Sequence, residues 1–383
     1  MTDPSSPIRP PSSRDPRLDV FRGICLVMIF INHVPGNAFE DWTSRNFGFS
    51  DAAEGFVMMS GIAAGLAYSA DFRDRSARLW TGLARVWRRV WTLYLVHIAT
   101  TLAALAIAAA VALWFDDARI LFKNQMKWVW LDPLHTFIGL VTLSHQFGYI
   151  NILPLYLALL AVSPIAFYAA WRWPLRLMAV SVALWFLTGL FRLGPPNFPS
   201  EGVWFFNPMA WQVIFVAGLI TGVSIRAGRR FVPVIPWLQV ATGIFLFYAA
   251  LSAQFPAIGK ITGQTLWLAK ETFHLPWHLT AFDKTFVTAP RLLHILALTY
   301  FLSTFPAIRR ACAHALAAPF ELLGRQALPV FALGSVLCIG LQGIKLTTGE
   351  DLLTDSLLIG GGLALQFALA AARQYWPKPL KVS

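Results

Sequence analysis

Residues 17–33 read RLDVFRGICLVMIFINH, an apolar run whose ionisable side chains stand near its two ends. A helix needs roughly 20 mostly apolar residues to cross a bilayer core of about 30 Å. Ionisable groups are expensive in lipid, so Arg22 and His33 are candidates for a function. Their spacing brings both to one face of a helix, about 16 Å apart along its axis at 1.5 Å per residue. The alternative is that these residues have no catalytic role: Asp19 paired to Arg22 anchors the topology, and His33 is a structural histidine before Pro35.

Composition extends this interpretation to the whole chain. Of the 383 residues, 57% are hydrophobic and 13% are charged, whereas a soluble domain carries roughly 25% charged residues. We therefore expect an all-α polytopic membrane protein, a bundle of about ten transmembrane helices. The expected spans are 18–34, 52–70, 90–115, 150–170, 174–192, 208–225, 234–254, 288–305, 327–346 and 353–373. The two longer outer loops, 116–149 and 255–287, could hold interfacial or re-entrant helices.

The net charge of +12 reflects topology. If the N-terminus is inside, 21 of the 31 Lys and Arg residues fall on the inner side, which is the positive-inside pattern for an even number of spans. Both termini are then cytoplasmic, and nucleic-acid binding has little support. We expect a disordered cytoplasmic tail at 1–16, a single transmembrane domain at 17–376 and a second cytoplasmic tail at 377–383.

A pair of carboxylates follows the first span. Ser50 or Asp51 can cap a helix whose first turn holds Glu54. The loop from the first span is short, so both carboxylates start near His33. A carboxylate bonded to an imidazole fixes its tautomer and raises its basicity. The sequence thus predicts that His33 is a general base held by Glu54 or Asp51. The alternative is that the two carboxylates only cap the start of a helix.

Three arginines precede the apolar part of the third span, at Arg85, Arg88 and Arg89. Guanidinium groups bind phosphate in a bidentate manner, so the cluster could clamp the phosphates of a donor such as coenzyme A. The alternative is positive-inside charge alone.

The remaining polar signals are weaker. Five polar side chains at span ends are candidates for binding substrate or stabilising an oxyanion: Asn32, Asn207, Asp283, Arg291 and His294. The sequence holds no HExxH, CxxC, GxSxG or Walker pattern, and its three cysteines do not pair at ligand spacing. We therefore expect no metal site.

Three features resemble the wider transmembrane acyltransferase (acyltransferase-3-like) superfamily: Arg22 followed after ten residues by His33, then Ser60-Gly61, then Arg85-x-x-Arg88. Several further motifs resemble the OpgC family in particular. The OpgC-like motifs are Asp19-x-x-Arg22-Gly23, Phe47-Gly-Phe-Ser-Asp-Ala-Ala-Glu54, Ile152-Leu-Pro-Leu-Tyr156, Phe206-Asn-Pro-x-Ala-Trp-Gln212, Asp283-Lys284, Pro290-Arg-Leu-Leu-His294 and Gly324-Arg325-x-x-Leu-Pro329. They span nearly the whole chain.

This resemblance implies a bacterial inner-membrane O-acyltransferase that moves a succinyl group from cytosolic succinyl-CoA to hydroxyls of an osmoregulated periplasmic glucan. It maps the catalytic histidine onto His33 and the donor site onto Arg85 and Arg88, and we add Arg89, Arg22 and Arg325 to the donor site. The cofactor is succinyl-CoA or acetyl-CoA, with no metal; the partners are the glucan, acyl-CoA and the lipid bilayer, with no nucleic acid, and an oligomer is compatible with the sequence. The alternatives are acetyl transfer to another extracytoplasmic saccharide and a carrier without chemistry.

Overall fold

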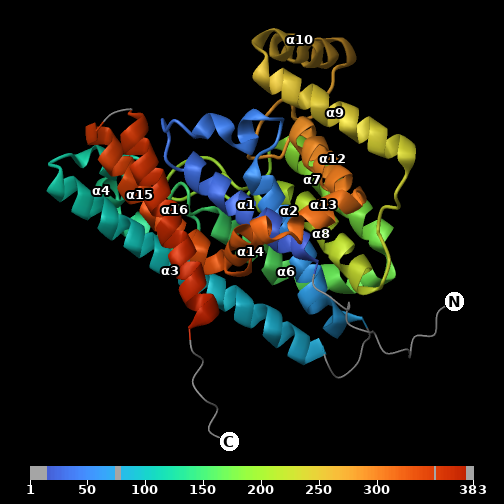
Figure 1. Cartoon of the computed structure of the whole chain (residues 1–383), viewed down its shortest axis with the longest axis horizontal. Helices are drawn as coiled ribbons and strands as arrows, with labels where there is room; N and C mark the ends of the chain where they lie inside the picture. Colours follow the sequence, from blue (N-terminus) through green and yellow to red (C-terminus); the bar gives the residue numbers. More distant parts are fainter. Residues whose placement is uncertain (1–14, 74–78, 349–350, 377–383) are drawn as a thin grey trace, which may run out of the picture.

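The computed structural model describes residues 15–73, 79–348 and 351–376, and there the chain is built from helices (Figure 1). Within these ranges the β-structure amounts to an isolated bridge between Pro196 and Val203. The longer helices are α1 (Pro16–Asn32), α2 (Ala52–Tyr68), α3 (Leu79–Trp114), α6 (Ile152–Arg172), α7 (Pro174–Phe191), α8 (Pro208–Arg226), α9 (Pro236–Gln254), α10 (Pro256–Phe273), α12 (Ala289–Thr304), α15 (Ala327–Thr348) and α16 (Leu352–Tyr375).

The all-α membrane architecture predicted from the sequence is confirmed. Each of the ten expected spans falls on a long helix, and seven helices in the described ranges are long and apolar enough to cross a bilayer. An eighth arises if α12 and α13 (Pro306–Cys312), bent by 84°, form one broken span. The helices α1 and α2 have 17 residues each and fall just short, so the count of ten remains a prediction.

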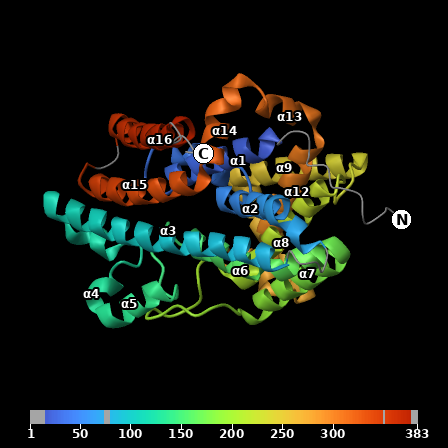
Figure 2. The same cartoon turned by 90° about the horizontal axis from the view of Figure 1, so that it is seen from below.

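The two long loops contain helices. The first holds η4 (Ala118–Phe122), α4 (Trp128–Leu131) and α5 (Pro133–Val141), which lie beside the far end of α3 (Figure 2). The second holds α10 and α11 (Trp277–Thr280), and α10 packs on α9 at the edge of the bundle (Figure 1). Both loops therefore hold helices, which the sequence had left open.

The centre of the bundle is the crossing of α2 and α8. Gly61 and Gly65 on α2 lie against the backbone of α8, while Gly218 and Gly222 on α8 lie against the backbone of α2. A Cβ atom at any of the four would collide with a backbone atom of the partner helix. This reciprocal small-residue contact allows the close approach typical of membrane helices, and it fixes the start of α2, which carries Asp51 and Glu54.

Helix α3 is longer than a membrane requires. Its 36 residues extend for about 54 Å at 1.5 Å per residue, against a bilayer core of about 30 Å. The arginine cluster lies in its first three turns. We call the end of the bundle that holds these turns and Pro16 the inner end, following the charge bias, and the opposite end the outer end.

The predicted tails lie largely outside the described residues. Of the segment 1–16, only Asp15 and Pro16 are described, as the N-cap and first residue of α1. The segment 377–383 lies outside altogether. Four shorter elements complete the described chain: η1 (Glu40–Trp42), η2 (Ser44–Asn46), η3 (Ser69–Phe72) and η5 (Ala315–Ala317), together with α14 (Ala318–Arg325).

Candidate active site

A cavity of about 660 Å³ opens at the outer end, where α1 ends and α2 begins. Its walls come from several separate segments of the chain, including the loops before α6 and α8. Several lining side chains are amides, Asn32, Asn124, Gln125, Gln146, Asn151 and Asn197, and others are aromatic, Tyr149, Phe205 and Phe206. The cavity also contains His33, Asp51 and Lys284, so it gathers several residues that the sequence separates widely.

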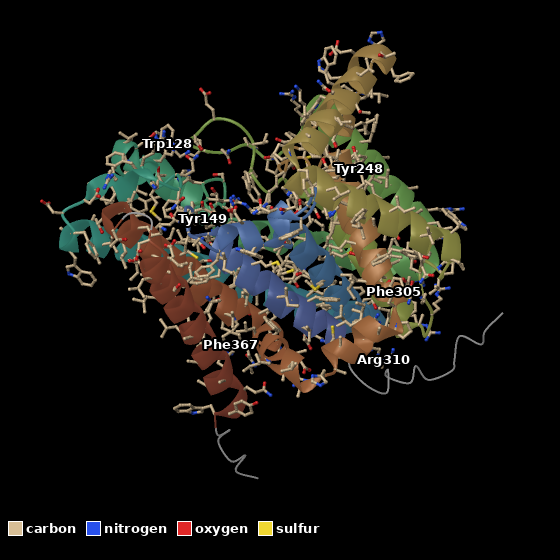
Figure 3. All side chains as sticks on the ribbon, turned by 45° about the horizontal axis from the view of Figure 1, so that its top comes forward. Trp128, Tyr149, Tyr248, Phe305, Arg310 and Phe367 are labelled. Atoms are coloured by element: carbon tan, nitrogen blue, oxygen red, sulfur yellow. The ribbon has the colours of Figure 1, made fainter. Side chains whose placement is uncertain are left out.

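His33 stands directly after the last residue of α1 and lines this cavity. Its ring contacts that of Tyr149, with centroids 4.4 Å apart and planes inclined by 48°. Figure 3 shows Tyr149 close to that end of α1. No hydrogen bond to either ring nitrogen of His33 is seen from the described residues. The imidazole is therefore open to a ligand in the cavity.

A second histidine of the cavity, His145, already has a hydrogen-bond partner within the protein. His145 is buried, and its Nε2 donates to the backbone carbonyl of Gln125 at 3.0 Å. Burial lowers the pKa of His145, and the bond to that carbonyl offsets the effect only in part. The bond to Gln125 fixes the orientation of the His145 ring, whereas neither ring nitrogen of His33 is bonded by a described residue, so we take His33 as the candidate base.

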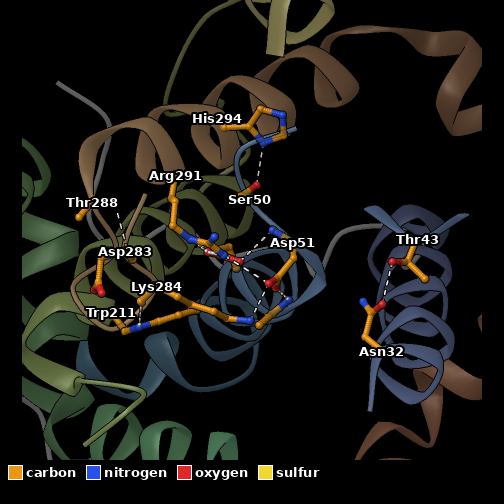
Figure 4. Close-up of polar contacts among 12 residues, drawn as sticks. Asn32, Thr43, Ser50, Asp51, Trp211, Asp283, Lys284, Thr288, Arg291 and His294 are labelled. Carbon is orange, nitrogen blue, oxygen red and sulfur yellow. Dashed lines mark hydrogen bonds and ion pairs between the residues drawn. The ribbon is translucent and has the colours of Figure 1, made fainter. Parts of the chain in front are cut away.

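The orientation of the Asn32 amide is set by a neighbour. The Thr43 hydroxyl donates to Asn32 Oδ1 at 2.8 Å (Figure 4). The bond to its oxygen holds the Asn32 amide at the cavity wall, next to His33 in the chain. Amide donors held in a fixed direction suit the stabilisation of an oxyanion.

The two carboxylates form an ion-pair network (Figure 4). Lys284 Nζ donates to Asp51 Oδ2 at 2.6 Å, and Arg291 lies between the carboxylates, 2.7 Å from Glu54 Oε1 and 3.3 Å from Asp51 Oδ2. Burial raises the pKa of Asp51, but the charges of Lys284 and Arg291 outweigh burial and hold that pKa below its ordinary value. Asp51 therefore stays ionised and keeps Lys284 in place at the cavity.

The same residues cap α2. Asp51 accepts from the Ala53 amide at 2.8 Å, and Glu54 accepts from the Asp51 amide at 3.1 Å, so the predicted helix cap is present and Asp51 provides it. The predicted bond from a carboxylate to the His33 ring is not found: Glu54 is fully buried behind Asp51 and paired with Arg291. The two carboxylates instead hold cations, which attract them more strongly than a neutral ring.

Three further candidates have structural partners. Asn207 is buried and caps α8, donating to the Leu193 carbonyl at 2.6 Å. Asp283 accepts from the Phe286 amide at 2.9 Å and closes a turn. His294 Nδ1 lies 2.7 Å from the buried Ser50 hydroxyl. Like Arg291, which belongs to the ion-pair network, these three residues are not among the described residues that line the cavity.

The arginine cluster lies at the inner end, far from this cavity along the helix axes. Arg85 is paired with Asp71 at 2.6 Å. Arg88 is exposed and Arg89 is half-buried. Within the described residues Arg88 has no carboxylate partner, so it is the member of the cluster most available to an anion.

Arg22 and Arg325 share a carboxylate near the inner end. Arg22 lies 3.5 Å from the buried Asp19 and donates to the Met59 carbonyl at 3.3 Å. Arg325 lies 4.0 Å from Asp19 and pairs with Glu321. The predicted pairing of Asp19 with Arg22 is therefore present, and both arginines have partners within the protein.

Sequence reasoning did not single out Tyr149 or the amides of the first outer loop. No periodicity marks a loop residue, so no pattern in the sequence could place Tyr149 against His33. Lys284 was noted only within a motif; its position beside Asp51, 233 residues earlier, depends on tertiary packing.

Together, the fold and this cavity define a multi-pass helical membrane protein with a polar site at one end of its bundle. The chain belongs to the OpgC protein family, whose family model matches residues 14–378. Membership in this family indicates a transferase related to osmoregulated periplasmic glucans. Searches of curated proteins and of solved structures found no match.

Proposed function

We propose that the protein is a bacterial inner-membrane O-acyltransferase that moves a succinyl group from cytosolic succinyl-CoA to a hydroxyl of a periplasmic glucan. The observation that supports this most is His33, an imidazole without a described hydrogen bond, in a cavity lined by amides and aromatic rings. Amides bond sugar hydroxyls, and aromatic faces cover the apolar faces of sugar rings. The resemblance of the Arg22, His33, Ser60-Gly61 and Arg85-x-x-Arg88 positions to the acyltransferase-3-like superfamily supports the same reaction.

In the proposed mechanism, His33 removes the proton of a glucan hydroxyl as the oxygen attacks the thioester carbonyl. The carbonyl oxygen gains charge and is stabilised by the Asn32 amide. When the intermediate collapses, the carbon–sulfur bond breaks, and the coenzyme A sulfur leaves with the proton that His33 carries. The competing route has His33 itself attack the thioester and pass the acyl group on.

Arg45 is the cation of the cavity that suits an acyl chain with a free carboxylate. The carboxylate of Glu40 lies 3.8 Å from Arg45, a distance that leaves Arg45 able to bind another anion. Lys284 also lines the cavity, but it is paired with Asp51. Succinyl carries a terminal carboxylate and acetyl does not, so Arg45 supports a succinyl donor over an acetyl donor.

The donor side gives a prediction for Arg88→Ala. Phosphate contacts are the same in the ground and transition states, so this variant should raise KM for acyl-CoA more than it lowers kcat. Each charge-assisted bond lost should cost about 1.5–3 kcal/mol of donor affinity. Arg88→Lys should recover only part, because an ammonium group cannot make the bidentate contact.

The matched control is Arg310→Ala, which removes an equally exposed arginine from α13 near the inner end. Binding of coenzyme A to the purified, folded variants provides the measurement. If Arg88→Ala binds coenzyme A as tightly as the wild type, the arginine cluster serves topology alone. If both variants lose the same affinity for coenzyme A, the general positive charge of the inner end binds the donor and Arg88 is no specific phosphate clamp.

The topology can be measured independently of activity. With 21 of 31 cations on the inner side, both termini should be cytoplasmic. A C-terminal fluorescent-protein fusion should fluoresce, while a C-terminal alkaline phosphatase fusion should be inactive. The reverse result would mean an odd number of spans, with α10 the first helix to re-examine.

The proposed reaction is tested with purified protein in lipid nanodiscs, given acyl-CoA and glucan. We expect release of free coenzyme A together with a glucan that has gained the acyl mass, faster with succinyl-CoA than with acetyl-CoA. Faster transfer from acetyl-CoA would mean that the transferred group is acetyl. Binding of glucan without acyl transfer would favour a carrier.

A further inference from the structure

We propose that α15 carries a stripe of four hydrogen-bond donors that positions His33 and Tyr149 for the reaction; this rests on the proposed function. The stripe consists of Ser335, Cys338, Gln342 and Lys345. At 100° per residue the four side chains lie within roughly 80° of one another. They interrupt an otherwise apolar span on the side that faces α1.

Each member of the stripe donates to a backbone carbonyl of the segments that hold the two rings. Ser335 donates to the carbonyl of Tyr149 at 3.2 Å, and Cys338 to that of Phe30 at 3.6 Å. Gln342 Nε2 donates to the carbonyl of His33 itself. Lys345 donates to the carbonyl of Gly36 at 2.7 Å.

The need for these donors follows from the way α1 ends. The last carbonyls of a helix have no partner within it, and Pro35 has no N–H to donate to them. A buried carbonyl without a donor is costly. At this helix end the Phe30 carbonyl already accepts from the His33 amide at 3.1 Å, and the Ile31 carbonyl accepts from Asn37 Nδ2 at 2.9 Å. The α15 donors add a second bond at the Phe30 carbonyl and supply a donor to the His33 carbonyl, and in doing so they hold the turn on which His33 stands.

Gln342 and Lys345 are themselves held in place. Gln342 accepts from Asn124 Nδ2 at 2.7 Å, and Asn124 lines the cavity. Lys345 forms a buried ion pair with Asp355 of α16, the two side chains being 7% and 3% exposed. Asp355 also accepts from the Ala38 amide at 2.9 Å, so the pair binds the loop after His33 at two points.

The consequence is that α15 and α16 act as a support for the reacting imidazole without touching substrate. Because the stripe holds the backbone on both sides of the ring contact, it sets the direction of the His33 ring against Tyr149. A misplacement of about 1 Å can lower a rate by about 100-fold, so a positioning role should be visible in kcat.

The test compares Gln342→Met with Gln212→Met. Gln212 of α8 also donates to a backbone carbonyl of another helix, that of Ser181 at 2.8 Å, but it is not among the residues of the cavity. We expect Gln342→Met to lower kcat by about 10- to 100-fold with little change in KM for acyl-CoA, and Gln212→Met to leave kcat near that of the wild type.

A second variant, Lys345→Met with Asp355→Leu, removes both charges together and leaves no buried charge unpaired. It should lower kcat in the same way. Hydrogen exchange of the backbone amides in 30–40 should rise in both α15 variants and stay unchanged in Gln212→Met.

An unchanged kcat in both α15 variants, an equal loss in Gln212→Met, or unchanged exchange in 30–40 would each overturn the positioning role. If the wild type transfers no acyl group while the exchange pattern follows expectation, the proposed function has failed and the support of the His33 turn stands.

Discussion

His33→Ala should reduce acyl transfer by about 10²–10⁴-fold, the usual contribution of a general base. The side chain stands at the end of α1 and makes no described hydrogen bond through its ring, so its loss breaks no such bond and removes the ring contact with Tyr149. The folded protein should therefore survive the change. The measurement is acyl transfer by variant protein that elutes from size exclusion as the wild type does.

The control is His135→Ala, which removes an exposed histidine of α5 paired with Asp132. This variant should transfer at the wild-type rate. Near-normal activity of His33→Ala would exclude His33 from the mechanism. A loss greater than a general base explains would favour the acyl-His33 route.

Arg291→Gln should be the most destabilising single change at the outer end. Glu54 is fully buried, and Arg291 donates to it at 2.7 Å. Removing one partner of a buried ion pair costs about 3–5 kcal/mol, because the other charge remains without compensation. We expect a large fall in the temperature at which the detergent-solubilised protein aggregates.

The double variant Glu54→Gln with Arg291→Gln distinguishes the cause. It removes both charges, so it should recover much of the stability lost in Arg291→Gln. Glu54→Gln alone should be milder, since Arg291 keeps Asp51 as a partner at 3.3 Å. If Arg291→Gln is as stable as the wild type, the pair does not hold α2 against α12.

The sequence predicts helices far better than it predicts their partners. Hydrophobic runs place every expected span on a helix, because a helix of suitable length satisfies its own backbone in lipid. The cap at Asp51 is predicted for the same reason, since a cap depends on residues a few positions apart. The span count is harder: α1 and α2 are buried and short, and burial among other helices reduces the length of apolar chain that each needs.

The site is predicted only in part. Asp51, His33 and Asn32 do line one cavity, as their closeness along the chain suggests. The carboxylates bind Lys284 and Arg291, however, which come from more than 230 positions later; charge pairing over such separations depends on how helices pack. The polar stripe on α15 could be predicted from the sequence. Four donors at helical spacing in an apolar span indicate a helix face that has hydrogen-bond partners in the protein.

Acylation of a periplasmic glucan through His33, as we propose it, can be measured in cells. Mass spectrometry of periplasmic glucans tests it most directly, in cells that carry the wild-type chain, no chain, or His33→Ala at equal membrane abundance. We expect succinylated glucan with the wild-type chain, and unmodified glucan both without it and with His33→Ala. Equal succinylation in all three would contradict it.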